Sequence, residues 1–233
     1  MGVTYNPRIV TDGLVLALDA GNTKSYPGSG TSWTDLSGNG NNGTLTNMDG
    51  ANLDSANGGS LTFDGTNEEV RITNYNQSLY HLNCWVYLNS TITASSSNGF
   101  FNYGSPSQPG VDFGSVTGLV SGETLTILYE NPSNTYRRTS ITENISSGWN
   151  FITFNWNGSS YDIYINSISK TTTFGTSTGH VPLIVPTNLT FGYGYTSTIK
   201  FSGNIAQVST YNRALTALEI QQNFNALRGR FGI

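Results

Sequence analysis

The sequence predicts an all-β domain that is closed by a single C-terminal helix. Short runs of β-branched and aromatic residues recur along the chain, separated by clusters of Gly, Asn, Ser and Pro, a pattern typical of a sandwich or barrel. One helical segment with clear start and stop signals follows the last of these runs. A chain of 233 residues suits one large β-domain. We therefore expect a single domain over residues 11–233, preceded by an N-terminal arm over residues 1–10.

The strand-like runs are either apolar throughout or alternate between apolar and polar residues. Residues 13–19 are apolar on both faces, which predicts a central or covered strand. In residues 150–156 the alternation predicts one packed face and one partly wet face. The remaining runs predict strands at residues 60–63, 69–72, 80–88, 125–129, 161–165, 188–191 and 200–208.

Two dipeptides between these runs have the composition of hairpin turns. Asp64-Gly65 separates two predicted strands, and Asn157-Gly158 is the clearest hairpin signal in the chain. Residues 25–42 and 91–98 are rich in small polar residues, and we expect both segments to be long loops.

The last forty residues contain the helix signals. Thr216 is a natural N-cap, and Glu219 three residues later completes a capping box, in which each side chain accepts a hydrogen bond from an otherwise unpaired backbone amide. Gly229 is the expected stop. The apolar stripe of this helix is formed by Leu218, Ile220, Phe224 and Leu227.

Composition and charge exclude several classes of protein. Charged residues make up 10% of the chain, against about 25% in an average protein, and the net charge is −4. Non-specific nucleic-acid binding requires clustered Lys and Arg, so no nucleic-acid partner is expected. No apolar run is long enough to span a bilayer, and no signal-peptide core is present, so no membrane partner is expected. The single cysteine, Cys84, lies in an apolar segment, which predicts a buried and unreactive thiol.

Several segments together resemble the laminin G-like, concanavalin A-like jelly rolls. They are LVLALDAGNTKSY at residues 14–26, WTDLSGNGNNGTL at 33–45, GSLTFDGTNEEV at 59–70, and the runs 148–165 and 201–220. The resemblance implies a jelly-roll β-sandwich of two antiparallel sheets, with the first and last strands adjacent and the helix near the edge. In this family the hairpin in the C-terminal part of the domain usually has the sequence Tyr-x-Asn-Gly. This chain has Tyr164-Ile165-Asn166-Ser167 there, which leaves the geometry of that turn open.

The segment DAGNTKSYPGSGT at residues 19–31 also resembles domains in structural proteins of tailed bacteriophages, especially marine ones. That resemblance implies a non-catalytic virion module, either a capsid decoration or a tail-fibre component. Such a module would be assembled in the host cytoplasm and displayed on the virion surface, with other virion proteins or further copies of itself as partners. Residues 2–10 would be a docking arm. Because the same fold hosts many functions, a glycan-binding adhesin of a bacterial cell and a glycoside hydrolase stay open as alternatives.

Catalytic patterns are weak in this sequence. Glycoside hydrolysis needs two carboxylates about 5–9.5 Å apart, and carboxylates at i and i+2 of a strand would share a face. The acidic residues of the strand regions show no such spacing, and the Glu-x-Asp-type motif of the hydrolytic relatives is absent. His81 and His180 are the only histidines, and no nucleophile elbow accompanies them. We therefore expect no enzymatic activity.

Three aspartates are candidate ligands for calcium, which takes carboxylate, carbonyl and water oxygens. Asp19 stands at the end of the first predicted strand, Asp35 lies in the long loop, and Asp64 begins a turn. Asp19 is the first choice among them. The competing interpretation is that Asp35 and Asp64 simply belong to tight turns.

Three tyrosines are candidates for binding a glycan, because the apolar face of a sugar stacks on aromatic rings. Tyr193 and Tyr195 alternate with glycine and would share a strand face, and Tyr103 lies beside a Gly-Ser-Pro loop. Since the sequence contains no large basic cluster, the expected ligand is a neutral or weakly charged polysaccharide. Contacts within the core or between subunits are the alternative role of these rings.

Overall fold

The computed structural model describes residues 8–94, 96–103, 110–114, 122–130, 136–174, 188–194 and 199–233. Its strands form two antiparallel sheets, which we call sheet A and sheet B. Sheet A runs in the order β14-β13-β12-β7-β17-β5-β4, and β1 also pairs with β17. Its strands are β1 (Leu14–Asp19), β4 (Leu53–Asp54), β5 (Ser60–Asp64), β7 (His81–Leu88), β12 (Gly148–Trp156), β13 (Tyr161–Ile165), β14 (Ile168–Ser169) and β17 (Ser202–Tyr211).

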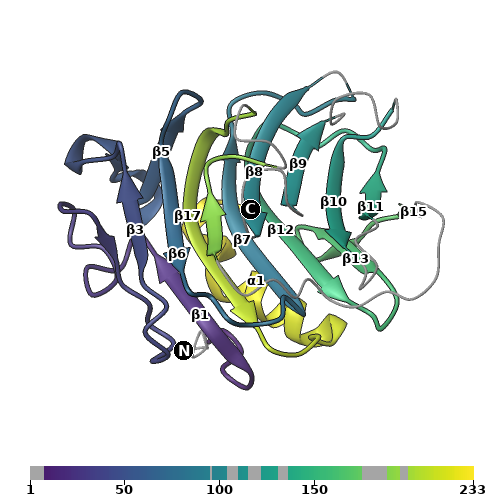
Figure 1. The fold of residues 1–233 in the computed structure, drawn as a ribbon, viewed down its shortest axis with the longest axis horizontal. Coiled ribbons are helices and arrows are strands. Elements are labelled where there is room, and N and C mark those ends of the chain that lie inside the picture. The colour runs from purple at the N-terminus through teal and green to yellow at the C-terminus, as the bar shows by residue number, and fades with distance from the viewer. Residues whose placement is uncertain are drawn as a thin grey trace, which may run out of the picture.

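Sheet B runs in the order β15-β11-β10-β9-β8-β16-β6-β3-β2. Its strands are β2 (Ser32–Trp33), β3 (Gly43–Thr46), β6 (Glu69–Thr73), β8 (Ser97–Tyr103), β9 (Gly110–Gly114), β10 (Leu125–Glu130), β11 (Tyr136–Ile141), β15 (Thr173–Phe174) and β16 (Asn188–Phe191). Two short 3-10 helices, η1 (Gly50–Asn52) and η2 (Ala56–Gly58), flank β4. Apolar side chains from both sheets meet between them in one large core. The predicted two-sheet sandwich is confirmed (Figure 1).

The last strand lies inside sheet A rather than at its edge. Along one side β17 pairs with β7 over residues 203–211, with a shift in register between Ile205 and Gln207. Along the other side β5 pairs with residues 202–205 and β1 pairs with residues 207–211. The first and last strands are therefore adjacent, as expected, and β1 is covered on both faces (Figure 1).

One of the two predicted hairpins is present. Asn157-Gly158 connects β12 to β13, which pair directly, and Gly158 has a φ of 100°. The prediction of a hairpin at Asp64-Gly65 is wrong, because β5 belongs to sheet A and β6 to sheet B. Gly65 does have a positive φ of 87°, so the dipeptide makes a tight turn, but the turn carries the chain from one sheet to the other.

Helix α1 (Ala217–Phe231) begins as predicted and ends later than predicted. Thr216 and Glu219 form the capping box. Gly229 does not stop the helix, which continues to a left-handed Gly232 with a φ of 73°. Leu218 is 78% exposed, so its assignment to the buried stripe is wrong, whereas Ile220 and Phe224 are buried.

Helix α1 packs on the outer face of sheet A, over β7, β12 and β17, and not near the sheet edge (Figure 1). A second apolar cluster fills this interface. The ring of Trp85 stacks on Phe231 at 4.2 Å and on Phe224 at 5.6 Å between centroids. For this reason the face of β12 that carries Phe151 and Asn155 is buried, although alternation predicted that it would be partly wet. None of the helices in the described part of the chain is long and apolar enough to span a membrane.

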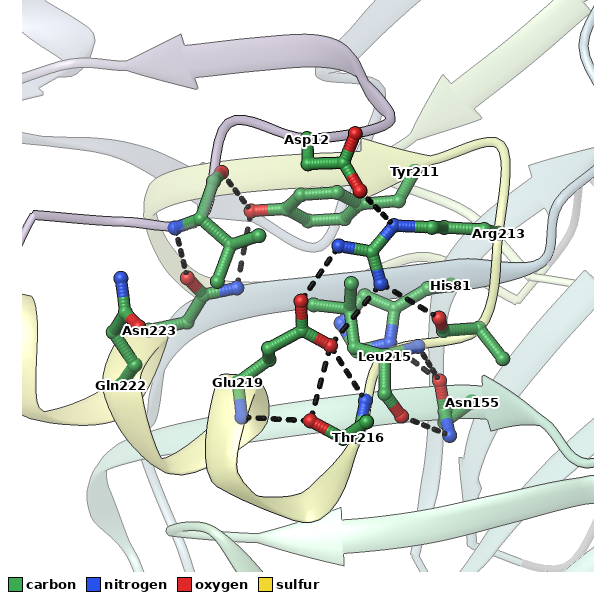
Figure 2. A network of polar contacts seen from close by, with 12 residues as sticks. Asp12, His81, Asn155, Tyr211, Arg213, Leu215, Thr216, Glu219, Gln222 and Asn223 are labelled. Atoms are coloured by element: carbon green, nitrogen blue, oxygen red, sulfur yellow. Dashed lines mark hydrogen bonds and ion pairs between the residues drawn. The ribbon is translucent and has the colours of Figure 1, made fainter.

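A polar network ties the start of this helix to both ends of the domain (Figure 2). Arg213 forms a bidentate ion pair with Glu219, at 2.6 and 3.1 Å, and a 2.8 Å ion pair with Asp12. The contact with Arg213 lowers the pKa of Glu219 to about 2. Nearby, Val10 is buried and bonded to Asn223, so the described end of the predicted N-terminal arm is packed on the domain.

Candidate functional site

The tyrosines predicted to bind a glycan do not form an exposed platform in the described structure. Tyr193 is only 2% exposed, and the ammonium of Lys200 lies 4.9 Å from its ring centroid. The prediction that Tyr193 is an exposed stacking residue is therefore wrong. Tyr195 lies outside the described residues. Tyr103 is the last residue of β8 and pairs with Leu189 of β16, and its side chain is not among those described.

All three candidate calcium ligands already accept hydrogen bonds from the protein. The Asp19 Oδ1 atom accepts hydrogen bonds from Gly21 N at 2.9 Å and from Arg230 Nη1 at 2.7 Å. Asp35 is buried and organises the long loop. Its two oxygens accept from Ala17 N, Ser37 N, Ser37 Oγ and Asn41 N, all at 2.8–3.0 Å. Four donors on one carboxylate leave few lone pairs for a cation.

Asp64, the third candidate, lies apart at the end of β5. Its Oδ1 accepts from Thr66 N at 2.7 Å, and hydrogen bonds from Thr66 hold the pKa of this carboxyl below its usual value. Among the described residues, no group of three His, Cys, Asp or Glu side chains could hold a metal ion. A bound calcium ion stays a prediction, and these contacts do not support it.

Polar side chains cover the outer face of sheet B where β3, β6 and β16 lie side by side. Glu69, Arg71 and Thr73 alternate along β6 with the core residues Val70 and Ile72. Their register partners on β3 and β16 are also polar. We call the six outward residues the sheet B polar face: Thr44, Thr46, Glu69, Arg71, Thr73 and Asn188.

Arg71 is the centre of the sheet B polar face. Its register partners are Thr44 on one side and Thr190 on the other, and Thr190 in turn pairs with Asn102 of β8. Arg71 Nη2 lies 2.9 Å from Glu69 Oε1, which balances the charge of the guanidinium. The result is a row of hydroxyl, guanidinium and amide groups that runs straight across four strands.

Two buried atoms of this row have no hydrogen-bond partner within the described part of the chain. They are Arg71 Nε and Thr190 Oγ1. More than nine in ten buried polar groups in proteins are paired, so these two atoms require an explanation, for example a bound water molecule. The Arg71 side chain as a whole is still 39% exposed, so part of it is accessible to a ligand.

Two carboxylates near β10 and β11, Glu123 and Glu143, hold different structural partners. Glu123 is buried and accepts from Thr126 Oγ1 at 3.1 Å and Ser140 Oγ at 2.7 Å, and it pairs with Arg138 Nε at 3.2 Å. Glu143 pairs with Lys170 at 2.8 Å. Glu123 therefore fastens β10 to β11 at one end of sheet B.

The described histidine and the cysteine are buried structural groups. His81 Nδ1 lies 2.8 Å from Asn155 Oδ1 (Figure 2). Since Nε2 lies 3.1 Å from Asn83 Nδ2, neutral His81 donates through Nδ1 and accepts through Nε2. Burial lowers its pKa to about 4. The Cys84 thiol is fully buried and burial raises its pKa, which confirms the predicted inaccessible thiol. His180 lies outside the described residues.

Sequence reasoning missed Arg71 and its neighbours because it searched for aromatic rings and metal ligands. A signal was present in residues 69–73, where charged or polar residues alternate with Val and Ile. Such a strand covers the core with one face and presents polar groups on the other.

A family model described as the concanavalin A-like lectin/glucanases superfamily matches residues 64–221, about two thirds of the chain. The chain belongs to this superfamily. The match includes β6, β16 and the outward residues Glu69, Arg71, Thr73 and Asn188, which are four of the six residues of the sheet B polar face. Membership establishes the fold and does not distinguish a binding module from an enzyme.

Solved structures of this fold are similar over nearly the whole chain. Domain 4 of AbnA, a GH43 extracellular arabinanase from Geobacillus stearothermophilus in complex with arabinotriose, matches with a TM-score of 0.61 and 17% identity, covering 90% of this chain and 97% of that one. The binding domain of botulinum neurotoxin DC in complex with SialylT matches with a TM-score of 0.62 and 17% identity, covering 94% of this chain and 52% of that one.

A third match, the binding domain of Paraclostridial Mosquitocidal Protein 1, has a TM-score of 0.58 and 14% identity, and it covers 93% of this chain and 52% of that one. The chain thus spans about half the length of both toxin binding domains. At these identities the likeness concerns the fold. No match was found among curated proteins.

Proposed function

We propose that this concanavalin A-like domain is a non-catalytic module that binds a neutral glycan on the sheet B polar face. The observation that carries the proposal is the row centred on Arg71. At the strand surface it offers the exposed hydroxyl of Thr44 and the partly exposed Arg71, and two of its buried polar atoms lack partners among the described residues. Sugar hydroxyls both donate and accept hydrogen bonds, so they fit such a mixed row.

The charge of the site favours a neutral ligand. Glu69 already neutralises Arg71 at 2.9 Å, and a free anion would have to compete with that carboxylate. Two of the similar structures were solved with sugars, neutral arabinotriose for the arabinanase domain and sialylated SialylT for the neurotoxin domain, and they support a glycan ligand without favouring either charge. The separate structural engagement of Glu123 and Glu143 supports a binding role over hydrolysis.

Titration calorimetry with arabinotriose and with N-acetylneuraminic acid tests this proposal. We expect heat from the neutral sugar and a loss of about 10- to 100-fold in its affinity in Arg71→Ala, because hydrogen bonds to charged groups contribute about 1.5–3 kcal/mol. Arg228→Ala, on the exposed side of α1, is the matched control. Binding of the acid alone would refute the neutral ligand, and unchanged binding by Arg71→Ala would refute the site.

We further propose where this module is displayed. The resemblance of residues 19–31 to tailed-phage structural proteins supports a place on the virion surface, among other virion proteins or further copies of the chain. Mass spectrometry of purified virions tests it, because absence of the chain from particles would leave a bacterial adhesin as the better account. Turnover of a polysaccharide that is lost on changing one carboxylate would instead establish an enzyme.

A further inference from the structure

A second row of side chains crosses the opposite side of the sandwich, on the outer face of sheet A. Register pairs place Trp149 of β12 beside Tyr87 of β7, Tyr87 beside Asn204 of β17, and Asn204 beside Thr62 of β5. Their chain neighbours Val86, Leu88, Ile205, Leu61 and Phe63 belong to the core between the sheets, so all four side chains of the row point outward. We call these four residues the sheet A row.

The sheet A row lies just beyond the C-terminal end of helix α1. Phe231, the last residue of the helix, packs on Trp149 with 4.5 Å between ring centroids. Tyr87 contacts Trp149 edge to face at 5.5 Å and stays 38% exposed. The helix therefore covers one side of Trp149 and leaves the adjacent Tyr87 accessible.

Trp149 is held firmly in this position. In the amide orientation that satisfies both polar atoms of Asn57, the side-chain oxygen of Asn57 accepts from Trp149 Nε1 at 3.1 Å. With Phe231 packed on it as well, the indole cannot turn without breaking both contacts. A fixed aromatic support reduces the ordering that a ligand would otherwise impose on binding.

The polar end of the sheet A row is also fixed. Asn204 Nδ2 donates to Ser60 Oγ and to Thr62 Oγ1, both at 3.1 Å, so both amide hydrogens are used and the orientation of the amide is set. No contact within the described residues uses Asn204 Oδ1. That oxygen, with the hydroxyls of Tyr87 and Thr62, supplies hydrogen-bonding groups beside an aromatic ring.

We infer that the sheet A row is a second binding surface, whose ligand is a segment of a neutral polysaccharide. Tyrosine combines an apolar ring with a polar tip, and a sugar has an apolar face edged by hydroxyls, so the two fit in stacked contact. None of the four side chains is charged, which favours a neutral ligand over an anion. The row spans three strand spacings, about 14 Å, so a chain of several sugar residues is favoured over a single sugar. The inference stands on residues of the other sheet and does not rest on Arg71.

Affinity electrophoresis in gels containing arabinan, xylan, mannan or mixed-linkage glucan tests the inference. We expect at least one of these polysaccharides to retard the wild-type chain, and Tyr87→Ala to weaken that retardation about two- to tenfold, the range expected for one aromatic contact. Tyr87→Phe should keep most of the binding, because the ring is retained. Leu218→Ala removes another exposed apolar side chain far along the helix and is the matched control.

A measurement on the wild-type chain tests the inference even if the variants misfold. The other three tryptophans, Trp33, Trp85 and Trp156, are buried, whereas Trp149 is partly exposed. The retarding polysaccharide should therefore protect the exposed fraction of tryptophan fluorescence from acrylamide quenching.

Three results would overturn the inference. They are no retardation by any of the four polysaccharides, retardation that depends on Arg71 but not on Tyr87, and self-association that Tyr87→Ala abolishes while polysaccharide binding is unchanged. The second result would leave the sheet B polar face intact as the binding site. The third would identify a second copy of the chain as the occupant. Retardation lost in Tyr87→Ala but kept in Arg71→Ala would support the inference, and the calorimetry on Arg71→Ala decides the sheet B site separately.

Discussion

Tyr211 and Asn223 join the last strand to the helix that follows it, through a 3.0 Å hydrogen bond from Asn223 Nδ2 to the tyrosine oxygen (Figure 2). Both side chains also bind the backbone of Val10. The Tyr211 hydroxyl donates to Val10 O at 2.9 Å, and Val10 N donates to Asn223 Oδ1 at 2.8 Å. This closed ring of three buried hydrogen bonds connects both ends of the domain.

Asn223→Ala should destabilise the domain by about 1–3 kcal/mol, because it leaves the buried Val10 N–H without an acceptor and removes a donor from Tyr211. Urea unfolding followed by tryptophan fluorescence measures the change. The neighbouring Gln222→Ala is the control, since that side chain is exposed and should change the free energy of unfolding by no more than about 0.5 kcal/mol. Equal losses in the two variants would contradict the role given to the ring.

Acid should weaken the domain through His81. Burial lowers its pKa to about 4 in the folded state, against 6.5 for the free side chain, so between these pH values the unfolded chain binds a proton that the folded chain does not. Stability should be steady above pH 6.5 and fall from there toward pH 4, by at most about 1.4 kcal/mol per pH unit. Urea unfolding at pH 7.0, 5.5 and 4.5 tests this, and His81→Gln should show a shallower dependence. Parallel curves for the two proteins would exclude His81 as the cause.

Phe231→Ala should cost about 3–5 kcal/mol, the range for removing a buried aromatic side chain. The variant loses the stacking of Phe231 on Trp85 and Trp149. Ile233→Ala, two residues later and exposed, is the matched control. Thermal unfolding would measure both changes, and a small effect of Phe231→Ala would mean that the end of α1 is not firmly packed.

Cys84 should resist thiol reagents until the domain unfolds. Its side chain is fully buried, and burial raises its pKa, so the reactive thiolate is scarce and inaccessible. Labelling with a chromogenic disulfide at pH 8 should be negligible in buffer and complete in concentrated urea. Rapid labelling of the folded protein would show that sheet A opens locally near β7.

Much of the fold followed from local patterns in the sequence. The apolar run of β1, the alternation in β12 and β13, and the capping box of α1 each reflect physical requirements within a few residues. Strands with small or charged residues were missed, as in β8 (SNGFFNY) and β11 (YRRTSI), because apolar periodicity is weak there. The connection at Asp64-Gly65 was misassigned because a turn signal does not reveal which sheet the next strand joins.

The functional surfaces were harder to predict, because both depend on register between distant strands. Arg71 and Thr190 lie 119 positions apart in sequence and become neighbours only when β6 pairs with β16. Tyr193 has the local pattern of an exposed ring, but it is buried in the described structure. The prediction that the helix ends at Gly229 failed for a similar reason. Phe231 packs on two tryptophans, and these tertiary contacts stabilise the helix beyond Gly229.

The place of β17 inside sheet A has a consequence during synthesis. During synthesis β5 and β7 leave the ribosome long before residues 202–211, which pair with both, so these strand edges stay open until residues 202–211 have been made. Contacts between residues so far apart also slow folding. Open strand edges pair readily with other chains. A nascent chain of this design therefore gains from holding chaperones, and truncated products that stop before residue 202 are expected to aggregate rather than fold.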